Sequence, residues 1–162
     1  MILEKDSGEA AGPMETFERA CRAQGYSVTR QRKALYQALI ARRDHPTPES
    51  LFEDVRGELP SLSLATVYKS IEAFREMGLI NEVHPLRERM RLDGNLEPHH
   101  HLICVRCQAV IDVPAASVPS AEAALQLAPG ERQGFRVFSY SVSFSGLCPE
   151  CQRGAAPSSG LR

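Results

Sequence analysis

Hydrophobic side chains recur every three or four residues through the first half of the chain, which is the spacing of helices packed on a core. The apolar positions of four such segments are, in order, Met14, Phe17 and Cys21; Leu35, Ala38 and Leu39; Leu51, Phe52 and Val55; and Val67, Ile71 and Phe74. The residues suited to cap the last three helices are Thr29, Thr47 and Ser63. Gly25 and Gly78 mark the ends of the first and fourth helices. The short link "GELPSLS" before the fourth is typical of a helix-turn-helix.

The pattern changes to alternation after the fourth helix. Met90 and Leu92 alternate with Arg89 and Arg91, and Pro85 lies near the expected turn of a hairpin. Helices followed by a two-stranded hairpin are the layout of a winged helix.

The second half reads as a small α/β unit. "HLIC" and "AVIDV" are expected strands, "SVPSAEAALQLA" a helix and "FRVFSYSVSFSG" a long strand. In the long strand, serines at every second position alternate with Phe138, Tyr140, Val142 and Phe144, so one face is expected to be wet and the other dry. The predicted fold class is α+β, divided into a winged helix at 14–92, a hinge at 93–98 and an α/β unit at 99–153, with flexible tails at 1–13 and 154–162.

Composition and charge limit the classes of protein to which the chain can belong. No segment of the 162 residues approaches the roughly 18 consecutive apolar residues of a membrane span. The first residues lack an apolar stretch of signal-peptide length, so a cytoplasmic location is expected. Residues 14–92 carry 13 Lys and Arg against 11 Asp and Glu, a mild excess that permits nucleic-acid binding by the first half.

Four of the five cysteines form two C-x-x-C pairs. In a chain without an export signal, Cys104, Cys107, Cys148 and Cys151 favour a metal-thiolate site over disulfides. Four thiolates suit structural Zn²⁺. The alternative is two separate redox or core pairs, but neither pair is expected at a helix start after a parallel strand, the thioredoxin setting. Cys21 is expected in the core.

A second group of donors is rich in nitrogen and oxygen. His99 and His101 stand two apart at the start of a strand, so both rings can face one side. Asp112 lies among apolar residues, where a lone charge is costly, and Asp93 comes shortly before His99. These harder ligands suit Fe²⁺ or Mn²⁺ as well as Zn²⁺. Alternatively, "HHH" is a polar surface run. His84 and His100 are expected to be exposed.

Several stretches, taken in order, resemble the ferric uptake regulator (Fur) family of bacterial metal-dependent repressors. These are "VTRQRKALYQAL", "DHPTPESLFEDV", "SLSLATVYKSIEAFREMGLI" and "HHHLICVRC" with "CPEC", which together cover about residues 25–151. The resemblance implies a DNA-binding winged helix and a dimerisation unit. It assigns the four paired cysteines to structural zinc. It also implies a regulatory metal site formed by His45, Asp93, His99, His101 and Asp112.

The resemblance also bears on the branch of the family. The two acids of the regulatory site are usually Glu in iron-uptake regulators and Asp in peroxide-sensing ones, and here both are Asp. A further ligand that uptake regulators often carry before the first histidine is replaced by Pro98. Zinc-uptake regulators use a cysteine in the sensing site, and only Cys21 is left over. The resemblance therefore implies a peroxide sensor that uses Fe²⁺ or Mn²⁺, with oxidation at His45 or His99; the alternative is a metal-uptake regulator.

As a repressor of this family, the chain is expected to bind an AT-rich inverted repeat in double-stranded DNA as a homodimer. Residues expected to contact DNA are Arg32, Ala65, Thr66, Tyr68, Lys69, Arg89 and Arg91. For any one of them the alternative is packing or solvation.

Two other classes of protein explain less. A zinc deaminase needs H-x-E ahead of its cysteine pair, and a zincin needs H-E-x-x-H; the sequence has neither, so no enzyme is expected. A plain zinc-ribbon module would leave Asp93, Asp112 and the winged helix without a role.

Overall fold

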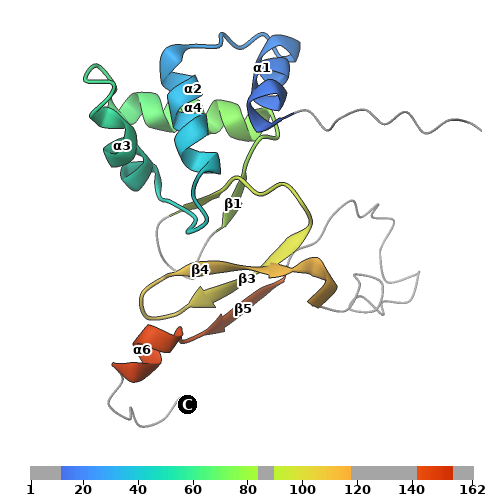
Figure 1. The fold of residues 1–162 in the computed structure, drawn as a ribbon, viewed down its shortest axis with the longest axis vertical. Coiled ribbons are helices and arrows are strands. Elements are labelled where there is room, and N and C mark those ends of the chain that lie inside the picture. The colour runs from blue at the N-terminus through green and yellow to red at the C-terminus, as the bar shows by residue number, and fades with distance from the viewer. Residues whose placement is uncertain (1–11, 84–89, 118–141, 155–162) are drawn as a thin grey trace, which may run out of the picture.

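The computed structural model of the protein describes residues 12–83, 90–117 and 142–154. The four predicted helices are present. They are α1 (Pro13–Ala23), α2 (Arg30–Ile40), α3 (Pro48–Arg56) and α4 (Leu64–Glu76). They form one lobe of the molecule, and a small sheet forms the other (Figure 1). No helix in the described part of the chain is both long enough and apolar enough to span a lipid bilayer.

The helix boundaries follow the predicted capping residues. The side-chain oxygens of Thr29, Thr47 and Ser63 each accept a hydrogen bond, at 3.2 Å, from the backbone N–H three residues later. Gly25 and Gly78 adopt positive φ angles of 74° and 67° just after α1 and α4, a conformation that other residues rarely tolerate.

The helical lobe closes around three aromatic rings. Phe17 stacks on Tyr36 at a centroid separation of 5.0 Å, and Phe74 meets both rings edge-on at 5.9 and 5.5 Å. Cys21 is fully buried in the same core, as predicted. Helix α4 packs on this core through Val67, Ile71 and Phe74, and its other side faces solvent.

A short antiparallel hairpin follows α4. Strand β1 (Asn81–Val83) pairs with β2 (Arg91–Asp93), and Leu92 of β2 is buried against the helices. This confirms the predicted wing. Its turn, with Pro85, His84 and Arg89, lies outside the described residues.

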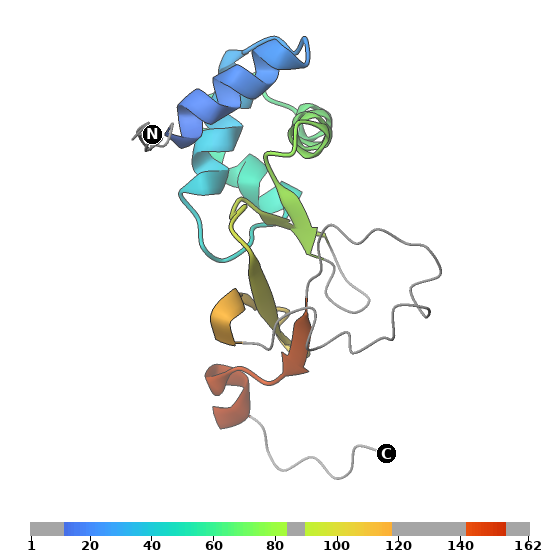
Figure 2. The same ribbon diagram turned by 90° about the vertical axis from the view of Figure 1, so that its right-hand side faces the viewer.

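The second lobe is a three-stranded sheet in the order β4-β3-β5. The central strand β3 (His99–Cys104) runs antiparallel to β4 (Val110–Pro114) and parallel to β5 (Ser143–Gly146). The one-turn helix η1 (Ala115–Ser117) follows β4, and the short helix α6 (Pro149–Arg153) follows β5 (Figure 2). The predicted helix at 118–128 and the first part of the long strand, 135–141, lie outside the described residues.

The two faces of this sheet differ in what they contact. On the face toward the helical lobe, β3 carries every second residue: His99, His101 and Ile103. On the other face, Leu102 pairs with Ile111 and Phe144, and the three are 46%, 52% and 41% exposed. The sequence predicted that the apolar face of the last strand is shielded from solvent, but Phe144 on that face is exposed. The reason is that nothing in the described part of the chain covers this face at that position.

Candidate metal centres

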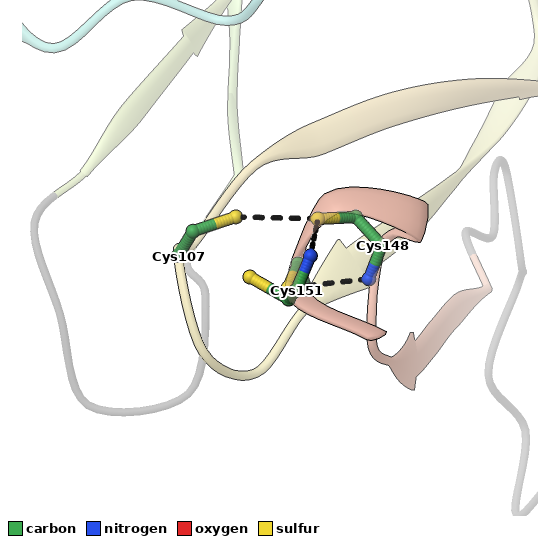
Figure 3. Close-up of side chains that lie close together, drawn as sticks. Cys107, Cys148 and Cys151 are labelled. Carbon is green, nitrogen blue, oxygen red and sulfur yellow. Dashed lines mark hydrogen bonds between the residues drawn. The ribbon is translucent and has the colours of Figure 1, made fainter. Parts of the chain in front are cut away.

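The sulfur atoms of four cysteines converge at the end of the sheet where β3 and β5 finish. Cys104 ends β3, Cys107 lies in the turn that follows, and Cys148 and Cys151 lie at the start of α6 and within it. Their Sγ atoms all lie within 4.8 Å of one another, and Cys107 Sγ is 3.7 Å from Cys148 Sγ (Figure 3). This spacing matches the edge of a tetrahedron of sulfurs about 2.3 Å from a central Zn²⁺.

Backbone N–H groups donate to two of these sulfurs, Cys104 Sγ and Cys148 Sγ. The Cys148 N–H donates to Cys104 Sγ and the Cys151 N–H to Cys148 Sγ, both at 3.4 Å. N–H groups of Cys107 and Cys148 directed at the Cys104 sulfur lower its pKa to about 6. Burial and the neighbouring thiols raise the pKa of Cys151 to about 12. The backbone N–H of Ala109 lowers the pKa of Cys107, but the thiols of Cys104 and Cys148 outweigh it and raise the pKa overall. A metal binds the thiolate form and displaces these protons, and four sulfurs at this spacing fit structural zinc.

The setting of the second cysteine pair corrects one prediction. Cys148 caps α6, which follows β5, and β5 runs parallel to β3. This is the helix-start setting of a redox pair that the sequence was expected to lack. All four sulfurs nevertheless converge, which favours a common metal site, because two independent redox pairs would not need to meet.

His45 is the only described donor of the second cluster that comes from the helical lobe. It lies in the connection between α2 and α3, is 4% exposed and has a φ of 51°, a left-handed conformation uncommon outside glycine. The next residue, Pro46, accepts a hydrogen bond of 2.9 Å from the backbone N–H of Leu92. Arg91 donates to the carbonyl of His45 at 3.4 Å. Strand β2 therefore fixes the position of the His45 loop beside Asp93.

Strand register places the remaining donors. His101 on β3 lies directly opposite Asp112 on β4, so their side chains share a face with His99. His99 Nδ1 lies 2.7 Å from the Glu97 carbonyl and must donate to it, because a carbonyl oxygen only accepts. The lone pair of His99 is therefore on Nε2, which lies 3.0 Å from His101 Nε2.

The two carboxylates complete the cluster. Asp93, at the end of β2, is 2% exposed, and its Oδ2 lies 3.1 Å from His99 Nε2 and 3.7 Å from His101 Nε2. Asp112 Oδ1 lies 2.9 Å from His45 Nε2 and 3.7 Å from His99 Nε2. Donor atoms about 2.1 Å from one ion are separated by about 3 to 3.5 Å, so this set fits a divalent cation.

Buried polar atoms support the same conclusion. His45 Nε2, Asp93 Oδ2 and Asp112 Oδ1 are shielded from solvent and have no hydrogen-bond partner among the described residues. His45 Nε2 and Asp112 Oδ1 are close, yet they are not aligned as a hydrogen bond. A buried polar atom without a partner costs about 1–3 kcal/mol, and a cation would satisfy all three.

The protonation states also suit metal binding. Burial lowers the pKa of His45, although Asp112 and Asp93 oppose the effect, so the ring is neutral at neutral pH. Burial by itself raises the pKa of Asp93, but the imidazole of His101 and the backbone N–H of Asn95 outweigh it and lower the pKa overall. A neutral imidazole and an ionised carboxylate are the forms that coordinate a metal.

A cavity of about 400 Å³ opens beside this cluster. It lies between the helical lobe and the connection that follows β2, and His45, Asp93 and Asp112 form part of its wall together with Asn95 and Tyr36. Small molecules can therefore approach the carboxylate side of the site.

The remaining histidines were expected to be exposed. His100 is 2% exposed, on the opposite face of β3 from His99, and its Nδ1 accepts the backbone N–H of Val142 at 3.2 Å. The prediction was wrong because His100 is buried on its face of β3 although Leu102, two residues later on the same face, is exposed, and a run of three identical residues gives no sign of this difference. His84 lies outside the described residues.

The predicted DNA contacts separate into two groups. Ala65, Tyr68 and Lys69 are exposed on α4, and the Tyr68 hydroxyl donates to Glu49 of α3 at 2.8 Å. The Thr66 hydroxyl lies 2.9 Å from that of Ser63 in the cap of α4.

Of the arginines, Arg32 donates to the Ser27 carbonyl at 2.8 Å and Arg91 to that of His45, whereas Arg89 is outside the described residues. Sequence reasoning missed two contacts, those made by Glu49 and by Asn95, since neither residue belongs to a spaced motif.

The chain is similar to known proteins over most of its length. The model of the ferric uptake regulator family matches residues 23–144. The peroxide operon regulator of Bacillus subtilis (strain 168) is 32% identical over 129 residues, which are 80% of this chain and 86% of the relative. A crystal structure of the Campylobacter jejuni peroxide stress regulator is similar, with a TM-score of 0.63 and 27% identity over 83% of this chain and 95% of that one. The structure of the Helicobacter pylori ferric uptake regulator is similar with a TM-score of 0.70 and 19% identity, over 90% of this chain and 97% of that one. At this identity the likeness shows a common fold and nothing more.

Proposed function

The chain belongs to the ferric uptake regulator family, and on that premise we propose that it is a metal-dependent, DNA-binding repressor of the peroxide-responsive kind. One observation carries the proposal: donors from both lobes, the imidazoles of His45, His99 and His101 and the carboxylate of Asp93, meet in one cluster beside a cavity, with the half-buried Asp112 next to His45 and His99. The protein acts as a transcriptional regulator in the cytoplasm, not as an enzyme.

Each of the two lobes has its own role, one in DNA binding and the other in metal binding and dimerisation. Residues 14–92 form the DNA-binding domain, 93–98 the hinge and 99–153 the metal-binding dimerisation domain, with tails at 1–13 and 154–162. Helix α4 is the recognition helix, because Ala65, Tyr68 and Lys69 are exposed on it while Val67 and Ile71 hold its other side in the core. Tyr68 contacts a thymine methyl group and Lys69 a phosphate. Thr66, Arg32, Arg89 and Arg91 support the same interface.

A homodimer presents two such helices to an AT-rich inverted repeat. The exposed apolar face of the second lobe, formed by Leu102, Ile111 and Phe144, supports dimerisation through the β4-β3-β5 sheet.

Two kinds of metal site are proposed. Zn²⁺ is held by Cys104, Cys107, Cys148 and Cys151, and Fe²⁺ or Mn²⁺ by His45, Asp93, His99, His101 and Asp112. A bound divalent cation supplies positive charge that offsets the two carboxylates, and iron in addition supplies redox chemistry with peroxide. Because His45 belongs to the helical lobe and the other donors belong to the wing end and the sheet, gathering them fixes one lobe against the other. The arrangement with the donors gathered is the DNA-binding state. Metal favours it because metal binds it more tightly than the arrangement in which the two lobes are apart.

Sensing is proposed to occur at His45 or His99. Hydrogen peroxide oxidises one ring by two electrons: a ring C–H bond is replaced by a C–O bond, and the second peroxide oxygen leaves as water. The oxidised ring is a poorer donor, so the His45 loop is released and the two lobes separate. The cavity beside Asp112 and Asp93 gives peroxide its approach.

The test begins with the protein purified without oxygen. Wild type and His45→Ala select binding sites from random DNA duplexes in the presence of Mn²⁺. We expect wild type to enrich AT-rich inverted repeats and His45→Ala to bind zinc normally but to lose metal-dependent DNA binding. Metal-dependent binding that survives in His45→Ala would refute the coupling of the two lobes.

Peroxide response is tested on the same duplex. With Fe²⁺, peroxide should release DNA and add one oxygen atom to His45 or His99, detected by peptide mass spectrometry; with Mn²⁺ it should do neither. DNA release without an added oxygen on either ring counts against sensing.

The second candidate is a regulator of metal uptake that does not sense peroxide. A likeness to the solved structure of a zinc-bound manganese uptake regulator, which is 27% identical with a TM-score of 0.59 over 82% of this chain and 98% of that one, favours it. It predicts the same metal-dependent DNA binding and no response of the Fe²⁺ protein to peroxide, so the peroxide experiment separates the two.

A further inference from the structure

Asn95 contacts both carboxylates of the regulatory cluster. It lies just after β2, in the connection between the two lobes. Its backbone N–H donates to Asp93 Oδ1 at 2.8 Å, and its side-chain amide donates to Asp112 Oδ2 at 2.9 Å. The orientation of the amide is fixed, because its Oδ1 accepts the backbone N–H of Glu97 at 3.2 Å.

These bonds leave one oxygen of each aspartate for a metal. Asp93 Oδ1 and Asp112 Oδ2 are engaged by Asn95, and the remaining two, Asp93 Oδ2 and Asp112 Oδ1, are the buried atoms without a hydrogen-bond partner among the described residues. Both remaining oxygens point at imidazole nitrogens, at 3.1 Å from His99 and 2.9 Å from His45. Asn95 thus divides each carboxylate into an outer oxygen, which it holds, and an inner oxygen nearer the imidazoles; the outer oxygen of Asp93 lies 3.7 Å from His45 Nε2.

We propose that Asn95 is a positioning residue that limits Asp93 and Asp112 to one metal-facing oxygen each. The inference rests on the proposed metal site and deepens it. A carboxylate can bind a cation through one oxygen or through both. With Asn95 in place, the site offers five donor atoms, three nitrogens and two oxygens, and a cation that prefers six ligands keeps a position for water or peroxide.

The same restriction sets metal preference. Ca²⁺ takes six to eight oxygen ligands, often from two-oxygen carboxylates, and so is disfavoured by a site with only two inner oxygens. Loss of the Asn95 amide frees Asp112 Oδ2 to turn toward the ion. The number of carboxylate oxygens then rises, and the preference for Mn²⁺ over Ca²⁺ falls.

Asn95→Ala tests this directly, because alanine keeps the backbone bond to Asp93 and removes only the amide bond to Asp112. Glu97→Gln is the matched control, since it removes a nearby charge without touching either aspartate. The readouts are Mn²⁺ and Ca²⁺ dissociation constants of the zinc-loaded dimer and the visible spectrum of the Co²⁺ form, which reports coordination number.

We expect the Mn²⁺ affinity of Asn95→Ala to fall by about 10- to 100-fold, the usual effect of losing an outer hydrogen bond at a metal site, and its preference for Mn²⁺ over Ca²⁺ to fall as well. Its Co²⁺ bands should weaken, and Glu97→Gln should match wild type. If Asn95→Ala does not fold, Asn95→Asp, which has the same shape but no donor, replaces it with the same expectation. An unchanged preference and spectrum in the folded variant would overturn the proposal.

Failure of the proposed function gives a different result. If wild type binds no second metal, or binds it equally well as His45→Ala, the regulatory site itself is wrong. If His45→Ala loses the metal while Asn95→Ala keeps wild-type preference and spectrum, only the role of Asn95 is wrong.

Discussion

His45 Nε2 and Asp112 Oδ1 lie 2.9 Å apart, although one belongs to the loop between α2 and α3 and the other to β4 of the second lobe. The two atoms do not form a hydrogen bond, and both are buried. We propose that the two atoms are ligands of a common cation. Under this proposal, a cation between them joins the helical lobe to the sheet.

Replacing Cys148 with serine should remove the structural zinc. The serine hydroxyl can still cap α6, so the variant changes the metal ligand while sparing the cap. Zinc in small Cys-rich sites contributes about 10–16 kcal/mol, more than the stability of a typical domain, so the second lobe should unfold. Zinc content and thermal unfolding followed by circular dichroism measure the effect. Cys21→Ala is the control and should keep its zinc; a full equivalent of zinc in Cys148→Ser contradicts the four-sulfur site.

Acidification should destabilise the protein that lacks a regulatory metal, in part through His45. Burial lowers the pKa of His45 below the ordinary value of 6.5, so the unfolded chain takes up this proton at a higher pH than the folded one. The contribution is fully present above about pH 6.5 and is lost as pH falls toward the folded pKa, by at most about 1.4 kcal/mol per pH unit. Urea unfolding of the zinc-loaded protein between pH 7.5 and 5.5 measures the slope.

The matched variant for this measurement is His45→Asn, because asparagine tolerates the left-handed φ of this position. It should show a shallower slope than wild type. Equal slopes would mean that His45 titrates normally in the folded state.

Lys69→Ala should weaken binding to operator and to unrelated DNA by the same factor. Lys69 is exposed on α4, and a phosphate contact carries no sequence information. The slope of log affinity against log salt should fall by about one for each protomer. Fluorescence anisotropy at several salt concentrations provides the measurement, with Arg19→Ala on α1 as a control of equal charge. A change in sequence preference would instead place Lys69 on a base.

Leu102→Asp should separate the dimer without unfolding the protomer. The side chain is 46% exposed in one copy of the chain, so a charge there is tolerated until a second copy covers it. Two such charges meet in a symmetric interface, and dimerisation should weaken by roughly 100-fold or more. Sedimentation velocity measures the state; Val28→Asp, which alters an equally exposed apolar residue between α1 and α2, should remain dimeric. A dimeric Leu102→Asp would move the interface elsewhere.

Local structure follows directly from the amino-acid sequence. Thr29, Thr47 and Ser63 cap their helices, and Gly25 and Gly78 end theirs, because these preferences depend on side chains within a few residues of the backbone they bind. The same holds for the paired cysteines, whose spacing alone restricts them to a tight turn. His45 entered the ligand set only through resemblance to a family, since nothing near it along the chain indicates a metal.

Only the tertiary structure decided which atoms of distant residues face one another. Strand register set Asp112 opposite His101, and the path of the α2–α3 loop brought His45 to them. The hydrophobic pattern and motif spacing likewise could not predict three other features: the burial of His100, the position of Cys148 at the start of α6, and the two hydrogen bonds of Asn95. A periodic pattern fixes the face of an element on which a side chain lies, whereas the partner across that face depends on loop paths and packing between elements far apart in the chain.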